Sequence, residues 1–155
     1  MATPAERLAE LGLTLPEPPK PVASYVPAVR TGDLVFTSGQ LPFVDGELPA
    51  VGLVAEGSDQ LPPDRARELA ATAVLNALAV VDAEVGLDAV VRVVRLVGYV
   101  ASAPGFVGQP GVIDGGSELL VSVFGDAGRH ARSAVGVASL PLGSPVEVEL
   151  VVEVS

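Results

Sequence analysis

Apolar residues recur along this chain with two periods, one typical of helices and one typical of strands. The helical period predicts a long helix over residues 64–85, which Gly86 ends. Most residues of its apolar stripe are small, so a sheet could pack closely against it. A second helix is expected over residues 112–124, loosened by Gly115 and Gly116.

Five stretches are expected to form strands, because in each of them apolar residues either alternate with polar ones or follow one another without interruption. These are residues 25–30, 34–38, 90–100, 133–140 and 145–154. Pro27 removes a ladder donor and places the first of them at an edge. The stretch with Arg92 and Arg95 is otherwise apolar on both faces, which is typical of a central strand.

The expected order is β-β-α-β-α-β-β, an α+β fold in which two helices cover one face of a mixed sheet. The other face also carries apolar residues, and no element remains to cover it, so we expect a buried oligomer surface there. Residues 1–21 form a separate N-terminal segment. In it, Thr3 and Glu6 predict a capping box, and a Pro-rich tether follows. The principal domain is expected over residues 22–155.

Composition narrows the possible functions. The 155 residues fit one domain with a sizeable core, and the abundant Val favours a large sheet. Nine basic residues against nineteen acidic ones, with no basic cluster, argue against nucleic acid. No apolar run is long enough to span a membrane, and no secretory signal is present, so the expected location is cytoplasmic. Without Cys, and with His130 as the single histidine, a zinc site is not expected.

Arg132 is the most informative polar residue because it opens an apolar strand-like segment. A guanidinium there needs a partner, either a structural carboxylate or the carboxylate of a small ligand. Strand alternation puts Arg132 on one face with Ala134 and Gly136, whose small size would leave open volume beside it. In the last strand, Glu147 is the first of several carboxylates that share a face.

Other polar residues allow both a structural and a functional interpretation. Ser38 at a strand end could be a turn hydroxyl or a site residue, and Tyr25 could simply pack. His130 could be an acid or base, or incidental. Asp114, before two glycines and a serine, could cap a helix or line a pocket.

Three segments together resemble the YjgF/RidA family, also known as endoribonuclease L-PSP. The first combines Tyr25 with the Thr-Ser-Gly-Gln-Leu-Pro run over residues 37–42. The second is the helix around Asn76, and the third is the stretch from Arg132 to Glu147, with its spacing of fifteen residues. The resemblance covers about residues 22 to 154 and indicates a divergent branch of the family.

The resemblance implies a chorismate-mutase-like fold assembled as a homotrimer, with sites between subunits. It implies hydrolysis of reactive 2-imino and enamino acids to 2-keto acids and ammonia, with no cofactor. Arg132 would hold the carboxylate of the small metabolite, and Glu147 would position the attacking water. Tyr25, Ser38 and the backbone at Gly39 would line the pocket.

The chain departs from the archetypal deaminases at one pocket position. Those proteins tend to carry an asparagine where Asp114 falls here, and an ionised aspartate cannot donate a hydrogen bond. Two other functions therefore stay open. One is a regulatory trimer that binds a small metabolite without turnover, and the other is a ribonuclease, which the charge balance disfavours.

Overall fold

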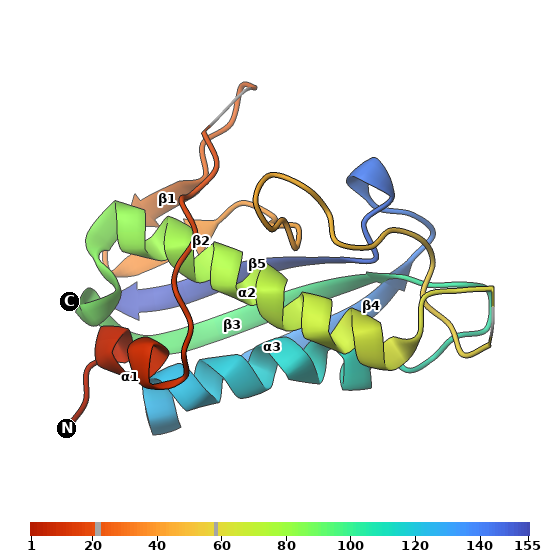
Figure 1. Ribbon diagram of the computed structural model, residues 1–155. Helices are drawn as coiled ribbons and strands as arrows, with labels where there is room; N and C mark the ends of the chain where they lie inside the picture. Colours follow the sequence, from red (N-terminus) through yellow and green to blue (C-terminus); the bar gives the residue numbers. More distant parts are fainter. Residues whose placement is uncertain (21–22, 58) are drawn as a thin grey trace.

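The computed structural model describes residues 1–20, 23–57 and 59–155, which form three α-helices and a five-stranded sheet (Figure 1). The helices are α1 (Pro4–Glu10), α2 (Pro63–Val85) and α3 (Gln109–Phe124). The strands are β1 (Ala28–Thr31), β2 (Leu34–Thr37), β3 (Val90–Ala101), β4 (Ala131–Val137) and β5 (Val146–Val154). The expected order β-β-α-β-α-β-β is confirmed from β1 onward. The expected boundary at Pro21 and Val22 lies outside the described residues.

The sheet is mixed, with strand order β1-β2-β5-β3-β4. β3 pairs in parallel with β4 across the connection through α3, and the other pairs are antiparallel. β3 therefore lies inside the sheet, as its apolar sequence predicts. Two strands differ clearly from the expectation. β1 begins at Ala28 because Pro27 cannot donate to a ladder, and β4 covers Ala131–Val137 instead of residues 133–140.

α2 and α3 pack side by side on one face of the sheet (Figure 1). Glycines set how closely they approach. A Cβ at Gly98 of β3 would lie 2.5 Å from Ile113 Cδ1 of α3, and a Cβ at Gly115 would overlap the Arg67 carbonyl of α2. At Gly116 a Cβ would lie 2.6 Å from Val74 Cγ2. Gly115 and Gly116, which were expected to loosen the second helix, let α3 seat against α2, and α3 is continuous from Gln109 to Phe124.

The other face of the sheet is uncovered within one chain. Residues of β1, β2 and β4 on this open face keep large exposed areas: Val29 is 53% exposed, Phe36 41% and Val135 43%. The same face carries Glu147, Glu149 and Val151 of β5, which pair across the ladder with the open-face side of β3. An apolar sheet face of this kind is typical of a surface that meets another protein.

The N-terminal segment lies on the helical side of the molecule. α1 has the predicted capping box, in which Thr3 Oγ accepts from the Glu6 amide at 3.2 Å and the Thr3 amide donates to Glu6 Oε2 at 2.8 Å. After α1 the chain has no regular structure up to Lys20, and Leu13 and Leu15 pack against the core. The tether therefore runs across the packed helices (Figure 1).

Candidate functional site

Glu147 lies at the start of β5 in a cavity of about 200 Å³. Bridging of Gln40 to Val148 brings the loop after β2 alongside this end of β5. A Cβ at Gly39 would overlap Glu147 Oε1, so only glycine lets the loop backbone lie against the carboxyl group. The cavity is lined by Pro19, Lys20, Tyr25, Pro27, Gly39, Gln40, Leu41, Phe43, Pro141 and Glu147.

The carboxyl group of Glu147 holds its proton more tightly than an ordinary glutamate. Burial removes water from it and raises its pKa, and the nearby carboxylate of Glu149 raises the pKa further. Glu149 in turn accepts a hydrogen bond from the Tyr99 hydroxyl at 3.0 Å. The pKa of Tyr99 is raised mainly by burial and then by this bond. A raised pKa makes the carboxylate a stronger base than an ordinary glutamate, which favours it as a group that accepts a proton and then returns it.

The two hydroxyl residues expected here are placed differently. Tyr25 lines the cavity and is 58% exposed. Ser38 is not among the residues that line the cavity. Its hydroxyl donates to the Val26 carbonyl at 2.6 Å, and its amide donates to the Pro27 carbonyl at 2.7 Å. Ser38 therefore holds the segment that carries Tyr25 onto the end of β2.

Arg132 lies elsewhere, on the helix-facing side of the edge strand β4. In the ladder it pairs with Leu96, whose side chain is buried under the helices. Its Nη1 donates to Asp114 Oδ1 at 2.7 Å and to Ser117 Oγ at 3.2 Å, both on α3. The Arg132 side chain is 23% exposed and that of Asp114 46%. Among the described residues, no hydrogen bond uses Arg132 Nη2 or Nε, so one edge of the guanidinium can still hold a carboxylate.

His130 continues this set of contacts. Its Nδ1 lies 2.6 Å from the Gly128 carbonyl and its Nε2 lies 2.9 Å from Ser117 Oγ. A carbonyl only accepts, so Nδ1 carries the proton and Nε2 accepts from the Ser117 hydroxyl. Ser117 Oγ can then accept from Arg132. His130 is therefore a half-buried part of the structure that orients Ser117 and, through it, Arg132.

The structure separates the two residues expected to act together. Arg132 is on the helix-facing side of the sheet and Glu147 is on the open face, two strands away in the order β5-β3-β4. Of the small neighbours expected to leave open volume beside Arg132, Gly136 lies under another side chain. A Cβ at Gly136 would lie 2.7 Å from Gln109 Nε2, so the start of α3 fills this space. One chain thus carries a carboxyl half-site around Glu147 and a guanidinium half-site around Arg132.

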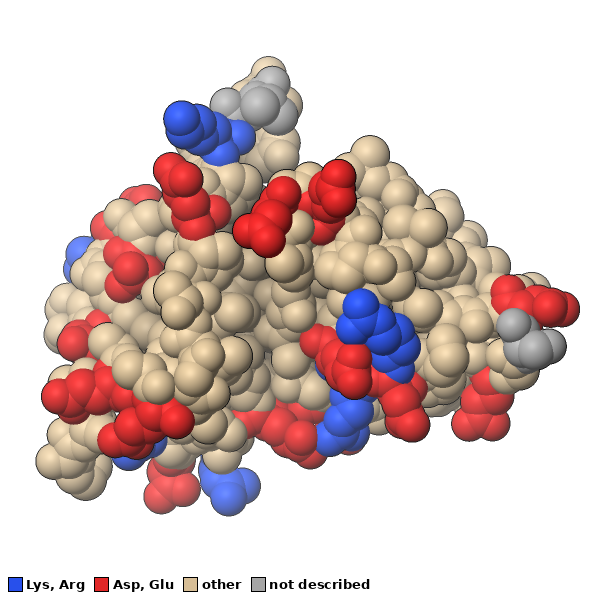
Figure 2. Space-filling view, in the orientation of Figure 1, with Lys and Arg blue, Asp and Glu red and all other residues tan. Residues whose placement is uncertain are grey.

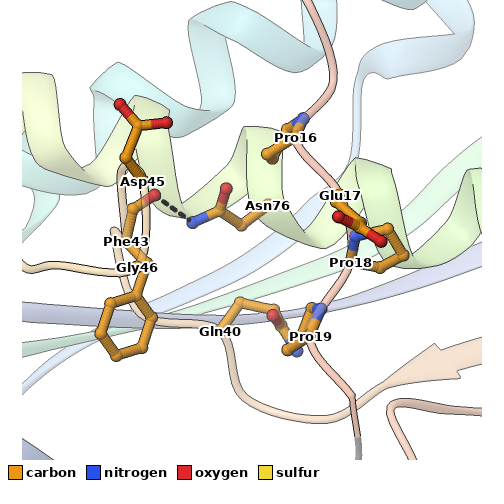
Figure 3. Close-up of a pocket in the computed structure, with 9 residues that line it drawn as sticks. All are labelled: Pro16, Glu17, Pro18, Pro19, Gln40, Phe43, Asp45, Gly46 and Asn76. Carbon is orange, nitrogen blue, oxygen red and sulfur yellow. Dashed lines mark hydrogen bonds between the residues drawn. The ribbon is translucent and has the colours of Figure 1, made fainter.

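A second cavity, of about 500 Å³, lies between the Pro-rich tether and the loop after β2 (Figure 3). It is lined by Pro16, Glu17, Pro18, Pro19, Gln40, Phe43, Asp45, Gly46 and Asn76. Pro19, Gln40 and Phe43 line both cavities. The tether therefore forms one wall of each.

Several of these lining residues were not expected from the sequence. Lys20, Gln40 and Phe43 belong to segments without periodicity, so nothing in the pattern places them at a cavity. Tyr99 does not line the cavity but bonds to Glu149, and its position could have been predicted, because strand alternation puts it on the same face as Arg95. The spacing of Glu147 and Glu149 by two residues likewise signals two carboxylates on one face.

Within the described part of the chain, no group of three or more His, Asp or Glu side chains is arranged to hold a metal ion. In the same residues, no helix combines the length and the hydropathy that crossing a membrane would require.

The arrangement of a five-stranded mixed sheet with two helices on one face defines an α+β protein of the chorismate-mutase-like kind. Residues 5–154 match the protein family described as "YjgF/chorismate mutase-like, putative endoribonuclease". The chain belongs to this family, as the resemblance in the sequence indicates.

Relatives share nearly the whole chain. Protein TCP17 of Trypanosoma cruzi is 41% identical over 153 residues, which are 97% of this chain and 94% of that protein. The crystal structure of Atu1372 from Agrobacterium tumefaciens is 42% identical with a TM-score of 0.87, covering 96% of this chain and 91% of that one. A structure from Shewanella oneidensis MR-1, described as a putative endoribonuclease, is 33% identical with a TM-score of 0.92, covering 99% and 100%.

Proposed function

We propose that this protein hydrolyses small 2-imino acids to 2-keto acids and ammonia, at sites completed between protomers of a homotrimer. The observation that carries this proposal is Glu147, a carboxyl group whose pKa is raised by burial inside a cavity of metabolite size. Membership of the family supports the reaction class, because solved relatives include a RidA protein from Psychrobacter, 28% identical to this chain.

The proposed reaction needs little from the protein besides positioning. The imine carbon is already electrophilic, so a water molecule held by ionised Glu147 can add to it while the carboxylate takes a proton. The imine reacts in its N-protonated form, so this addition gives a neutral carbinolamine. Protonated Glu147 then returns its proton to the amino group, and the carbinolamine hydroxyl gives its own proton to the Glu147 carboxylate as the C–N bond breaks and the keto group forms. The departing ammonia takes this last proton and leaves as ammonium, which restores ionised Glu147. The hydroxyl of Tyr25 and the backbone beside Gly39 lie around the same cavity and can position the substrate.

The substrate carboxylate requires a cation, and Arg132 of the same chain is on the wrong face to provide it. We propose that a second protomer places its edge strand β4, with Arg132, beside this cavity. The open face with Phe36 and Val135 would be the contact surface. Such a contact joins two different surfaces, so it closes into a ring of three when the rotation allows it.

The reaction is tested by generating imines with an amino-acid oxidase and following keto-acid release. We expect the purified protein to accelerate release and Glu147→Gln to lower the rate roughly a hundredfold. Glu153→Gln is the matched control, because it changes a glutamate on the same face of the same strand, six residues away. Wild-type protein that leaves the spontaneous rate unchanged would exclude this function.

A complementation experiment tests the shared site. Arg132→Ala and Glu147→Gln proteins are unfolded, mixed in equal amounts and refolded, and each parent is treated alone as a control. If each site takes Glu147 from one protomer and Arg132 from its neighbour, random mixing restores about a quarter of the wild-type sites. A site contained within one chain restores none. Sedimentation of wild-type protein and of Val135→Glu measures whether the open face makes the assembly.

A second candidate function, binding of an amino acid without turnover, is favoured by the Asp114–Arg132 pair. A zwitterion has a carboxylate for the guanidinium and an ammonium for the aspartate, whereas a keto acid has only the first. TdcF of E. coli, 26% identical over 90% of this chain with a TM-score of 0.59, was solved with bound serine. Calorimetry with serine and with 2-oxobutyrate separates the two. Asp114→Asn should shift the preference roughly fivefold toward the keto acid.

The family's description as an endoribonuclease receives no support from the charge distribution. The chain has a net charge of −10, and on the helical face acidic side chains are spread widely while basic ones occur in small separate groups (Figure 2). Binding to RNA depends on a basic patch that neutralises phosphates.

A further inference from the structure

The cavity between the tether and the loop after β2 has features of a ligand site that the proposed reaction does not use (Figure 3). It does not include Glu147, and Arg132 does not line it. Its volume of about 500 Å³ is within the range of about 300–1,000 Å³ usual for small-molecule sites. Its polar side chains are two amides and two carboxylates, so it carries no cation.

Two deeply buried amides provide the inner acceptors. Asn76 is 7% exposed and Gln40 is 6% exposed. Asn76 Nδ2 donates to the carbonyls of Leu41 at 2.8 Å and Phe43 at 3.0 Å, and Gln40 Nε2 donates to the Ser38 carbonyl at 3.2 Å. Carbonyls only accept, so these bonds fix which end of each amide faces the backbone.

The amide oxygens of Asn76 and Gln40 are left without a donor among the described residues. In that part of the chain, no fully buried side-chain nitrogen or oxygen lacks a partner. The two oxygens therefore keep some accessible surface. Both residues line this cavity, and Gln40 also lines the Glu147 cavity. A buried amide oxygen in an otherwise apolar wall favours a ligand that donates hydrogen bonds.

Two carboxylates stand at the rim of the cavity. Glu17 comes from the tether and Asp45 from the tight turn that the bridge between Val44 and Glu47 closes. Neither carboxylate forms an ion pair with any described residue. No Lys or Arg lines the cavity, so it attracts cations and repels anions.

The remaining walls are apolar and stiff. The ring of Phe43 forms one side, and the rings of Pro16, Pro18 and Pro19 form the other (Figure 3). Proline rings fix the backbone of the tether, which lowers the entropy lost on binding. An aromatic face attracts an ammonium or guanidinium group, and the proline rings can pack against a hydrocarbon chain.

We propose that this cavity binds a small organic cation, an ammonium or guanidinium compound with a short alkyl chain. Its charged head would donate to the Asn76 and Gln40 oxygens, and the rim carboxylates would balance its charge. An ammonium group has three N–H donors and a guanidinium has five, so either can satisfy both amide oxygens and one carboxylate together. This site shares Pro19, Gln40 and Phe43 with the Glu147 cavity, but the proposed binding does not use Glu147, Arg132 or a second protomer.

The test is a calorimetric titration of the full-length protein with agmatine, which carries an ammonium group at one end and a guanidinium group at the other. We expect saturable binding of about one agmatine per chain. Glu17→Gln and Asp45→Asn should each weaken it roughly three- to fivefold, and Phe43→Leu should weaken it by a similar factor. The control is Glu84→Gln, which removes an exposed carboxylate from α2 away from the cavity and should leave the affinity unchanged.

Other results would overturn the proposal. The acidic chain could attract amines without a site, and in that case Glu84→Gln would weaken binding as much as the rim variants. N-butylurea, a neutral analogue of the guanidinium head, should not bind measurably, and equal binding of the two compounds would remove the role of charge. Absence of saturable agmatine binding at millimolar concentration would exclude the site. The rim variants change exposed residues, so their thermal unfolding should match the wild type.

Discussion

Gly98→Ala tests the contact that seats α3 on the sheet and thereby places Asp114 beside Arg132. A Cβ at Gly98 would lie 2.5 Å from both Cδ1 and Cγ1 of Ile113 and 2.8 Å from its Cγ2. Carbon atoms pack favourably at about 3.5–4.0 Å, so Ile113 would have to retreat by about 1 Å. Ile113 is fully buried, which leaves little room for it to move.

The cost follows from this geometry. Overpacking of a core costs about 1–3 kcal/mol, and three clashing atoms favour the upper half of that range. The lower entropy of the unfolded alanine chain offsets about 0.4–1 kcal/mol. We expect a net loss of about 1–2.6 kcal/mol in the free energy of unfolding, which corresponds to a fall of about 2–10 °C in Tm for a chain of this size.

Urea unfolding followed by circular dichroism measures the loss, with Gly111→Ala as the matched control. Gly111 is also on α3, but a Cβ there would meet nothing within 4 Å. That variant should be more stable than the wild type by about 0.5 kcal/mol. Adding Ile113→Ala to Gly98→Ala should cost less than the sum of the single changes, because the clash disappears. Additive costs, or a Gly98→Ala protein as stable as Gly111→Ala, would refute the reasoning.

Three further predictions concern the site and the N-terminal segment. Glu147→Gln should become increasingly more stable than the wild type as pH rises above the ordinary glutamate pKa of 4.5, because the raised pKa of Glu147 makes its ionised form unfavourable in the folded state. Urea unfolding midpoints of both proteins from pH 3.5 to 7.5 measure this difference in stability. A difference that stays constant with pH contradicts the prediction. Gly39→Ala should lower keto-acid release at least tenfold with little change in stability, since its Cβ displaces the Glu147 carboxyl; an unchanged rate contradicts it. Thr3→Ala should remove about 1 kcal/mol from α1 alone. Amide exchange over residues 5–10 should become faster without a change in global unfolding, and unchanged exchange contradicts the prediction.

The parts of the fold that the sequence predicts are those governed by local rules. The capping box at Thr3 and Glu6 needs only four residues, and the structure has both of its hydrogen bonds. Strand alternation likewise places Glu147 and Glu149 on one face, and the apolar open face follows from counting helices against sheet faces. These inferences require no knowledge of which distant residues meet.

The parts that the sequence does not predict depend on contacts between distant segments. Whether Arg132 has a structural partner or a ligand is left open by the pattern, and the answer depends on Asp114, eighteen residues away on α3. Gly115 and Gly116 are destabilising in an isolated helix, but here the Arg67 carbonyl requires a glycine at 115 and the buried Val74 side chain lies against 116. Lys20 at the Glu147 cavity has no signal at all, because an irregular tether has no period to read.

The separation of the two half-sites has a consequence for how activity and stability are related. Within one chain, the fold is held by the helix-covered core, where Leu96, Leu150 and Ile113 are fully buried or nearly so. Glu147 is on the opposite face, and its cavity is formed without a partner. If a second protomer supplies the guanidinium, dilution should abolish hydrolysis through dissociation. The circular dichroism spectrum of the protomer should persist, and its unfolding midpoint should fall only by the contribution of assembly. The alternative is that activity stays proportional to protein concentration even where sedimentation shows monomers. That result would place the whole site in one chain, and Lys20, which lines the Glu147 cavity, would then be the cation for the substrate carboxylate.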